Sequence, residues 1–249
     1  MRVAAIVVSH GHAADVERLL PALLPQVEEL VVVANTPDSV GAVAAPARVI
    51  ENARPLGFAA NVNLGVRATQ GELVCTVNPD AVPRPDAIAI LREFMAERGR
   101  CGIAGPQLVY PDGRWQPSRR RFPTVSGTLV RRTPLRRVIG RSRRHYLLDE
   151  RPNEPVQADW MLGAFLLLRR TMLDELGGFD EGFRLYGEDI DLCYRAAKAG
   201  WERWYVPAAV VEHAHAAVTD KRFLTRRTLW HWRGILRFVR KHPERLRAL

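Results

Sequence analysis

The stretch Val3-Ala4-Ala5-Ile6-Val7-Val8 (VAAIVV, residues 3–8) is an uninterrupted apolar run rich in β-branched residues. Such a run, followed at once by polar Ser9-His10, is typical of a parallel strand that is buried on both faces of a sheet. Residues 13–24 come next and carry apolar side chains at helical spacing, although Pro21 disturbs the pattern. The chain therefore opens with a strand followed by a helix.

The same alternation continues through the first 110 residues. The sequence predicts strands at 30–33, 48–50 and 73–77 and helices at 58–68 and 86–97. This order indicates right-handed βαβ units and an α/β fold with a mostly parallel sheet flanked by helices. Ligands bind such sheets beyond the carboxyl ends of the strands. The polar residues that follow the strands are therefore site candidates: Ser9, Asn35, Asn78 and Asp80.

The second half is less regular. We expect a strand-like stretch at 156–169, helices at 171–176 and 190–199, short strands at 204–206 and 210–211, and a basic helix at 225–240. Residues 111–155, rich in Arg and Pro, are expected to form an irregular insertion over the sheet edge. The predicted organisation is one domain over 1–220, with halves 1–110 and 111–220, and a basic amphipathic helix within 221–249.

Composition excludes several classes of protein. Of 249 residues, 47% are hydrophobic and 26% charged, which excludes a disordered or collagen-like chain. No apolar run reaches the ~18–20 residues of a membrane span, and residues 3–8 are too few for a signal peptide. We therefore expect a cytoplasmic or peripherally bound protein. Three cysteines, far apart in the sequence, suggest neither disulfides nor a zinc site.

The net charge of +10 is concentrated in two segments. Residues 114–151 hold 12 arginines against two acidic residues, and residues 220–249 hold eight arginines and two lysines against two. The rest of the chain is acidic. Because guanidinium groups suit phosphate recognition, the pattern points to a nucleic acid, a nucleotide or diphosphate, or anionic lipid, and composition does not choose among them.

Two acidic clusters are candidates for chemistry. Asp80 follows the strand at 73–77 and could hold a divalent cation against a diphosphate, although Asn78-Pro79-Asp80 also favours a plain turn. Glu188, Asp189 and Asp191 repel one another unless a cation or a catalytic role offsets the cost. The first two would lie at a helix start, where a purely structural cap is the alternative. Asp191 is expected to pair with Arg195 one turn later.

A histidine pair and an arginine run complete the candidates. His213 is the preferred metal ligand and His215 the fallback, because side chains at i and i+2 of an extended chain point to opposite sides. Arg119-Arg120-Arg121 is either a solvated charged face or a set of guanidinium groups that close over phosphates.

Several short motifs follow one another between residues 3 and 215. They are 7–10 (VVSH), 57–65 (GFAANVNLG), 77–83 (VNPDAVP), 105–108 (GPQL) with 112–113 (DG), 120–123 (RRFP), 159–160 (DW), 163–167 (GAFLL) with 169–170 (RR), 177–181 (GGFDE), 187–195 (GEDIDLCYR), and 206–207 (VP) before His213. As an ordered set they resemble the bacterial rhamnosyltransferase-like branch of the inverting, family 2 glycosyltransferases.

The resemblance implies a GT-A fold and the transfer of a sugar, with inversion, from a nucleoside diphosphate to a hydroxyl, with Mg²⁺ or Mn²⁺ as cofactor. By motif, Asp189 takes the place of the catalytic base, with Glu188 beside it, and Asp80 and His213 take the metal-binding places. Trp160 and Glu188 fall on the acceptor side. The implied donor-binding residues are Ser9, Asn35, Gly57, Asn63, Asn78, Asp80, Arg120 and Arg121.

The most specific expectation is transfer of L-rhamnose from dTDP-rhamnose to a cell-envelope glycan or lipid-linked precursor. Ala34-Asn35 stands where relatives often have Asp-Asn, so recognition of the base falls to backbone groups or to Asp38, and a UDP- or GDP-sugar is the alternative donor. The basic helix at 225–240 either contacts the inner face of the cell membrane through Trp230, Trp232, Ile235, Leu236 and Phe238 or packs on protein. The sequence leaves the oligomeric state open.

Two rival functions remain. A nucleic-acid-binding protein would explain the arginines, but no recognition motif is present and the body is acidic, so no nucleic acid partner is expected. A sugar-phosphate nucleotidyltransferase would carry a Gly-rich N-terminal loop with a basic residue, which residues 3–12 lack.

Overall fold

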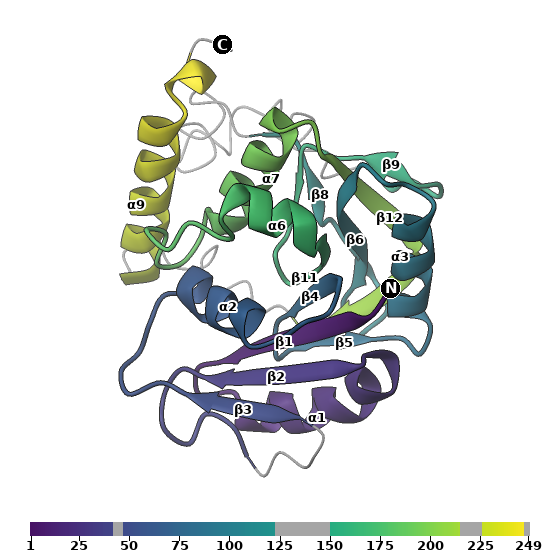
Figure 1. The fold of residues 1–249 in the computed structure, drawn as a ribbon, viewed down its shortest axis with the longest axis vertical. Coiled ribbons are helices and arrows are strands. Elements are labelled where there is room, and N and C mark those ends of the chain that lie inside the picture. The colour runs from purple at the N-terminus through teal and green to yellow at the C-terminus, as the bar shows by residue number, and fades with distance from the viewer. Residues whose placement is uncertain (42–46, 123–149, 215–225, 247–249) are drawn as a thin grey trace.

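The computed structural model describes residues 1–41, 47–122, 150–214 and 226–246 (Figure 1). The helices are α1 (Ala13–Leu23), α2 (Phe58–Arg67), α3 (Ala87–Ala96), α6 (Arg170–Leu176), α7 (Glu188–Lys198) and α9 (Arg226–Lys241), with 3₁₀ turns η1 (Leu24–Gln26) and η3 (Pro243–Leu246). The strands are β1 (Val3–Ser9), β2 (Glu29–Ala34), β3 (Arg48–Glu51), β4 (Leu73–Val77), β5 (Ala81–Pro83), β6 (Cys101–Val109), β7 (Trp115–Gln116), β8 (Arg119–Arg120), β9 (Val156–Gln157), β10 (Trp160–Met161), β11 (Phe165–Arg169) and β12 (Glu202–His213).

A ten-stranded sheet forms the centre, in the order β3-β2-β1-β4-β11-β6-β12-β5, with β7 beside β6 and β9 beside β12. Strands β3, β2, β1 and β4 run parallel to one another, and β6 runs parallel to β12, whereas β11 lies antiparallel between β4 and β6. Side chains of β1 alternate between two apolar clusters, Val3, Ala5 and Val7 in one and Ile6 and Val8 in the other. The predicted α/β fold is confirmed.

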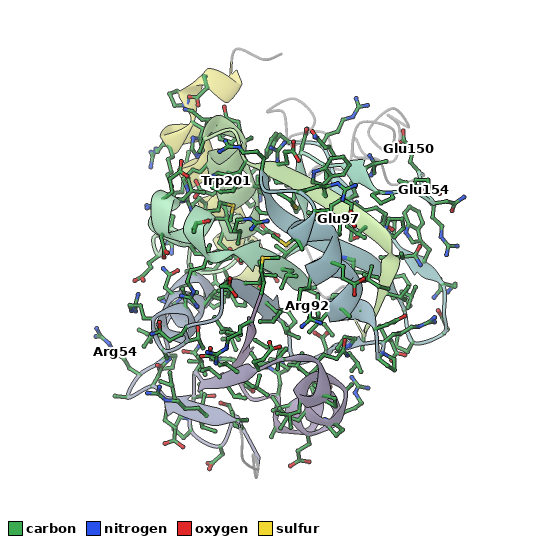
Figure 2. The ribbon with its side chains drawn as sticks, turned by 45° about the vertical axis from the view of Figure 1, so that its right-hand side comes forward. Arg54, Arg92, Glu97, Glu150, Glu154 and Trp201 are labelled. Carbon is green, nitrogen blue, oxygen red and sulfur yellow. The ribbon has the colours of Figure 1, made fainter. Side chains whose placement is uncertain are left out.

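Helices cover both faces of this sheet. Apolar side chains of α1 and α3 join the first cluster, and those of α2, α6 and α7 join the second. Trp201, labelled in Figure 2, packs into the second cluster and donates from Nε1 to Glu175 at 2.8 Å. The three cysteines are buried and free, and burial raises the pKa of each thiol. They pack as small hydrophobes, as expected.

Three sequence predictions differ from the structure. The short strands expected at 204–206 and 210–211 form one strand, β12. Strand β6 was not predicted, because Gly102, Gly105 and Pro106 disfavour a strand. Tertiary packing requires those glycines: a Cβ on Gly102 would lie 2.5 Å from Met172 Sδ, and one on Gly105 would lie 2.6 Å from Met161 Sδ. The predicted stretch 156–169 is three short strands, β9, β10 and β11, that pair with different partners.

Two adjacent arginines at the end of β11 connect helices on opposite faces of the sheet, α3 and α2. Arg169 donates to the carbonyls of Met95, Arg98 and Cys101 around the end of α3 at 2.7, 3.1 and 2.9 Å. Arg170 donates to Val66 and Gly71 at the end of α2, and to the Thr69 hydroxyl. Cations are favourable at the carboxyl ends of helices, so this pair has a structural task.

Candidate functional site

Asp80 and His213 lie at one edge of the sheet because β5 pairs antiparallel with β12, placing His213 opposite Ala81. The Ala214 amide donates to the Asp80 carbonyl at 3.1 Å. The Asp80 carboxylate Oδ1 is 3.5 Å from His213 Nε2. The structure therefore brings together the two residues that the resemblance assigned to a metal ion.

The surroundings of His213 suit a ligand of a metal ion. Its ring is buried, and Nδ1 lies 2.8 Å from the buried Gln116 Oε1. A carbonyl oxygen there accepts the Nδ1 proton and leaves the Nε2 lone pair toward Asp80, as in metal-binding histidines. Among the described residues no group of three or more such ligands occurs. The pair therefore fits an ion that takes its other ligands from phosphate oxygens and water, as Mg²⁺ does.

The second acidic cluster opens α7. Gly187 is its N-cap, with a left-handed backbone (φ 98°), and Glu188, Asp189 and Asp191 occupy the first turn. Asp189 is half-buried and accepts from the amides of Gly163 at 3.1 Å and Ile190 at 2.8 Å. Burial raises the pKa of Asp189, while these hydrogen bonds and the positive charge of Arg120 oppose the rise.

Glu188 is less exposed than Asp189. It is 7% exposed, and its Oε2 has no hydrogen-bond partner among the described residues. Burial, together with the charge of Asp189, raises the pKa of Glu188 from its ordinary 4.5 to about 8. Only one of two adjacent buried carboxyls ionises readily. Burial therefore favours the protonated form of Glu188, whereas the hydrogen bonds to Asp189 and the charge of Arg120 favour the ionised form of Asp189.

The two acidic clusters meet through the start of β11. Gly163 donates to Asp189, and the carbonyl of the next residue, Ala164, accepts from the Asn78 amide at 2.8 Å. A Cβ on Gly163 would lie 3.3 Å from the Asp189 Cβ. Asn78 is two residues from Asp80, so both clusters flank the same short segment although they are more than a hundred residues apart in sequence.

The arginine run is only partly solvated. Arg119 forms an ion pair with Glu150 at 2.7 Å. Arg120 is half-buried, pairs through its backbone with Trp160, and donates to the Pro117 carbonyl at 3.0 Å. Arg121 is exposed, and its carbonyl accepts from Trp160 Nε1 at 2.8 Å. The Trp160 ring is 7% exposed and packs in the second apolar cluster, so it offers little surface to an acceptor.

Four of the residues predicted to bind the donor make close contacts within the protein. Ser9 is fully buried, and its hydroxyl donates to the Ser39 carbonyl. Asn35 is 6% exposed and uses both amide atoms on His10, Asn52 and Leu56. Asn63 clamps the backbone of Phe179 at 2.8 and 2.9 Å. Gly57 allows close packing, because a Cβ there would lie 3.1 Å from the Arg184 backbone.

Sequence reasoning missed Gln116, which orients His213, and the amide of Gly163, which holds Asp189. Gly163 is the first residue of the motif at 163–167, so the sequence did offer a signal for it. Nothing in the sequence singles out Gln116. His215 lies outside the described residues. Asp38, the candidate for base recognition, is exposed with a left-handed backbone (φ 56°).

Comparison with known proteins agrees with this geometry. A family model described as "Glycosyltransferase like family 2" matches residues 2–231. The N-acetylglucosaminyl-diphospho-decaprenol L-rhamnosyltransferase of Mycobacterium tuberculosis is 29% identical over 284 residues, covering 98% of this chain and 90% of the relative. Rhamnosyltransferase WbbL of Escherichia coli is 26% identical over 252 residues, covering 94% and 91%.

Solved structures share the fold. GalNAc-T7, crystallised with UDP, GalNAc and Mn²⁺, superposes with a TM-score of 0.63 at 16% identity, over 86% of this chain and 44% of that one. Glucosyl-3-phosphoglycerate synthase of M. tuberculosis, in complex with Mn²⁺, UDP-glucose and phosphoglyceric acid, gives 0.61 at 17% identity, over 96% and 79%. These superpositions confirm the predicted GT-A fold, and the family model and the two relatives confirm the enzyme interpretation. The chain belongs to the family 2 glycosyltransferases.

Proposed function

We propose that this glycosyltransferase transfers L-rhamnose from dTDP-L-rhamnose, with inversion, to a hydroxyl of a lipid-linked precursor or glycan of the bacterial cell envelope. Support for the donor and acceptor class comes from the names of the two rhamnosyltransferase relatives, one of which carries N-acetylglucosaminyl-diphospho-decaprenol in its name. The observation that carries the proposal is the junction of the Asp80–His213 edge with Asp189 through Gly163 and Ala164.

In the proposed reaction the acceptor oxygen attacks the anomeric carbon as the bond from that carbon to the diphosphate oxygen breaks. Asp189 is proposed to take the acceptor proton, because two backbone amides and the charge of Arg120 favour its ionised form. Glu188, protonated, keeps a second negative charge away from the base and helps to orient the acceptor. Arg120, whose charge lowers the pKa of Asp189, is proposed to reach the diphosphate together with Arg121 and Asn78.

Asp80 and His213 are proposed to hold Mg²⁺ or Mn²⁺. A divalent ion there would neutralise the charge that develops on the leaving diphosphate. The half at 1–110, with Asp80, is proposed to bind the donor, and the half at 111–220, with Asp189, to bind the acceptor. Ser9, Asn35, Gly57 and Asn63 are proposed to shape the donor site through their contacts with Ser39, Leu56, Arg184 and Phe179. Trp160, which donates to the Arg121 carbonyl, is proposed to lie on the acceptor side.

Metal-dependent donor binding is the first test. A thermal-shift panel of dTDP-, UDP- and GDP-sugars, each with and without Mg²⁺ or Mn²⁺, should give a shift with dTDP-L-rhamnose that requires the metal. Asp80→Asn should abolish the metal-dependent part of that shift. Stabilisation by a UDP- or GDP-sugar alone would replace the proposed donor.

The base is tested by Asp189→Asn. With a short-chain N-acetylglucosaminyl diphosphoprenol as acceptor, release of dTDP should fall by about 10²–10⁴-fold, the usual contribution of a general base. Donor binding should stay within a few-fold of wild type. Near-normal turnover would remove Asp189 from the base role.

A peripheral contact with the cytoplasmic face of the membrane is also proposed, and α9 supports it. None of the helices in the described part of the chain is long and apolar enough to span a bilayer. Trp232 and Leu236, one turn apart on α9, are 36% and 48% exposed, and Arg233 and Arg240 are exposed too. An outer face of this kind suits an anionic lipid surface. Phe238, predicted to join that face, is instead buried against the domain.

Sedimentation with phosphatidylglycerol vesicles tests the contact. The double change Trp232→Ser with Leu236→Ser should release the protein into the supernatant, whereas Val49→Ser, an exposed apolar residue on β3, should not. Equal sedimentation of the two variants would show that α9 is not the contact.

A further inference from the structure

The turn that leads into the acidic pair has an unfavourable backbone. Tyr186 has φ 72° and Gly187 has φ 98°. Among the described residues, Tyr186 and Asp38 are the ones other than glycine with positive φ. A bulky side chain rarely adopts this conformation, which persists only where the surroundings enforce it. Because Glu188 and Asp189 follow directly, whatever holds this turn also sets the direction of their side chains.

Helix α9 lies against this turn. In Figure 1 it runs along one edge of the molecule (yellow), beside the loop that leads into α7. At Gly234 the backbone of α9 approaches so closely that a Cβ atom would overlap the Tyr186 carbonyl oxygen. From Gly187, a Cβ would lie 3.7 Å from the Gly234 carbonyl carbon and 3.1 Å from the Phe183 ring. The turn is thus enclosed between the Phe183 ring and a part of α9 that has no side chain.

Charged and aromatic contacts fix α9 in this place. Asp191 is fully buried and accepts from Arg195 at 2.7 Å, as predicted, and from Lys241 at 3.0 Å and His242 at 2.8 Å. Asp180 pairs with Lys241 and with Arg237, each at 2.7 Å.

The aromatic side of the contact lies on α7. The ring of Phe238 packs on Tyr194 with 5.6 Å between ring centroids, and His242 packs on the same tyrosine at 4.6 Å. α9 and His242 therefore contact the acidic segment 188–191 at both ends, at the turn before Glu188 and at Asp191.

We propose that Gly234 is a positioning residue: α9 holds the Tyr186–Gly187 turn, and thereby Asp189, in the geometry that proton transfer requires. The proposal rests on the base role of Asp189. It explains the third acid of the cluster, since Asp191 secures α9 rather than taking part in chemistry. It also explains a glycine inside a helix, where alanine has the higher helix propensity.

Gly234→Ala tests the proposal, with Gly99→Ala as the matched control because no atom lies within 4 Å of a Cβ there. The added methyl group must displace the Tyr186 carbonyl, and a small misplacement of a catalytic group lowers the rate steeply. With dTDP-L-rhamnose and the short-chain diphosphoprenol acceptor, kcat should fall at least tenfold. KM for the donor should stay within twofold, because Asp80 and His213 are untouched. Amide hydrogen exchange over 183–190 should speed up in the absence of substrates.

Either of two results would overturn the proposal: a kcat within twofold of Gly99→Ala, or a loss in kcat matched by an equal loss of donor affinity and thermal stability. If Gly234→Ala fails to fold, the double change Arg237→Met with Lys241→Met loosens α9 without overlap and is judged by the same criteria. Asp189→Asn separates the two hypotheses. If that variant is inactive while Gly234→Ala is normal, only the positioning role falls.

Discussion

Replacing Glu188 with Gln should stabilise the protein, and the gain should grow with pH. In the folded chain the pKa of Glu188 is raised from 4.5 to about 8, with burial as the main cause and the charge of Asp189 as the second. Between these values the unfolded chain releases the proton while the folded chain retains it, so ionisation favours unfolding. Stability from the neutral carboxyl is complete below about pH 4.5 and is lost as the pH rises to about 8.

The size of the effect follows from the same shift. Between pH 4.5 and pH 8, each pH unit lowers the free energy of unfolding by at most about 1.4 kcal/mol. The wild-type protein should therefore lose up to about 4 kcal/mol between pH 5 and pH 8 through this one group. Gln has nearly the shape of a protonated Glu and no proton to release, so Glu188→Gln should match the wild type near pH 5 and exceed its free energy of unfolding at pH 8.

Urea unfolding, followed by tryptophan fluorescence at pH 5, 6.5 and 8, measures the difference. Glu97→Gln is the control, because Glu97 (Figure 2) has a side chain that is 73% exposed, and exposed substitutions usually change stability by no more than about 0.5 kcal/mol. A stability difference for Glu188→Gln that does not change with pH, or that has the opposite sign at pH 8, would refute the assignment of the proton to Glu188.

Three further predictions concern neighbouring contacts. Arg120→Gln removes the positive charge that lowers the pKa of Asp189, so the acidic limb of the kcat–pH profile should move to higher pH; an unmoved limb would show that the two groups are uncoupled. Asp191→Asn removes a fully buried carboxylate that pairs with Arg195 and Lys241 and accepts from His242. Urea unfolding should show a loss of about 3–5 kcal/mol, and a loss of less than about 1 kcal/mol would contradict the burial of this network. Gly65→Ala places a Cβ 2.5 Å from Ile6 Cγ2 and should cost about 1–3 kcal/mol by overpacking, and a neutral result would mean that α2 shifts freely on β1.

Much of the fold could be predicted because its signals are local. The strand at 73–77 was located to the residue, and 3–8 differs from β1 by one residue. Continuous apolar runs mark strands buried on both faces, and this needs no knowledge of the partner strand. Strand β6 was not predicted, because its glycines are explained only by Met161 and Met172, which lie later in the chain and pack against them. Contacts between distant segments override local propensity in such cases.

The candidate site also has a part that the sequence predicts and a part that only the fold reveals. The positions of Asp80, Asp189 and His213 were predicted because their motifs are short and ordered, and Asp191 was assigned to Arg195 by helical spacing. The sequence predicts that Asn35 and Asn63 contact the donor, and the structure adds that both side-chain amides hydrogen-bond to backbone groups of the protein. Only the fold shows which polar groups already have partners.

The grip of α9 on the acidic segment has a consequence for biosynthesis. A polypeptide leaves the ribosome from its amino end, and folding proceeds in that order. The sheet, α7 and the carboxylates of the site emerge before residues 226–242. Of the ion-pair partners that Asp191 has in the described part of the chain, Arg195 precedes those residues, whereas Lys241 and His242 belong to them. A nascent chain halted at residue 220 would possess the chemistry without the geometry. If α9 positions Asp189 as proposed, a nascent chain becomes competent for transfer only after residues 226–242 have been synthesised and have packed on α7.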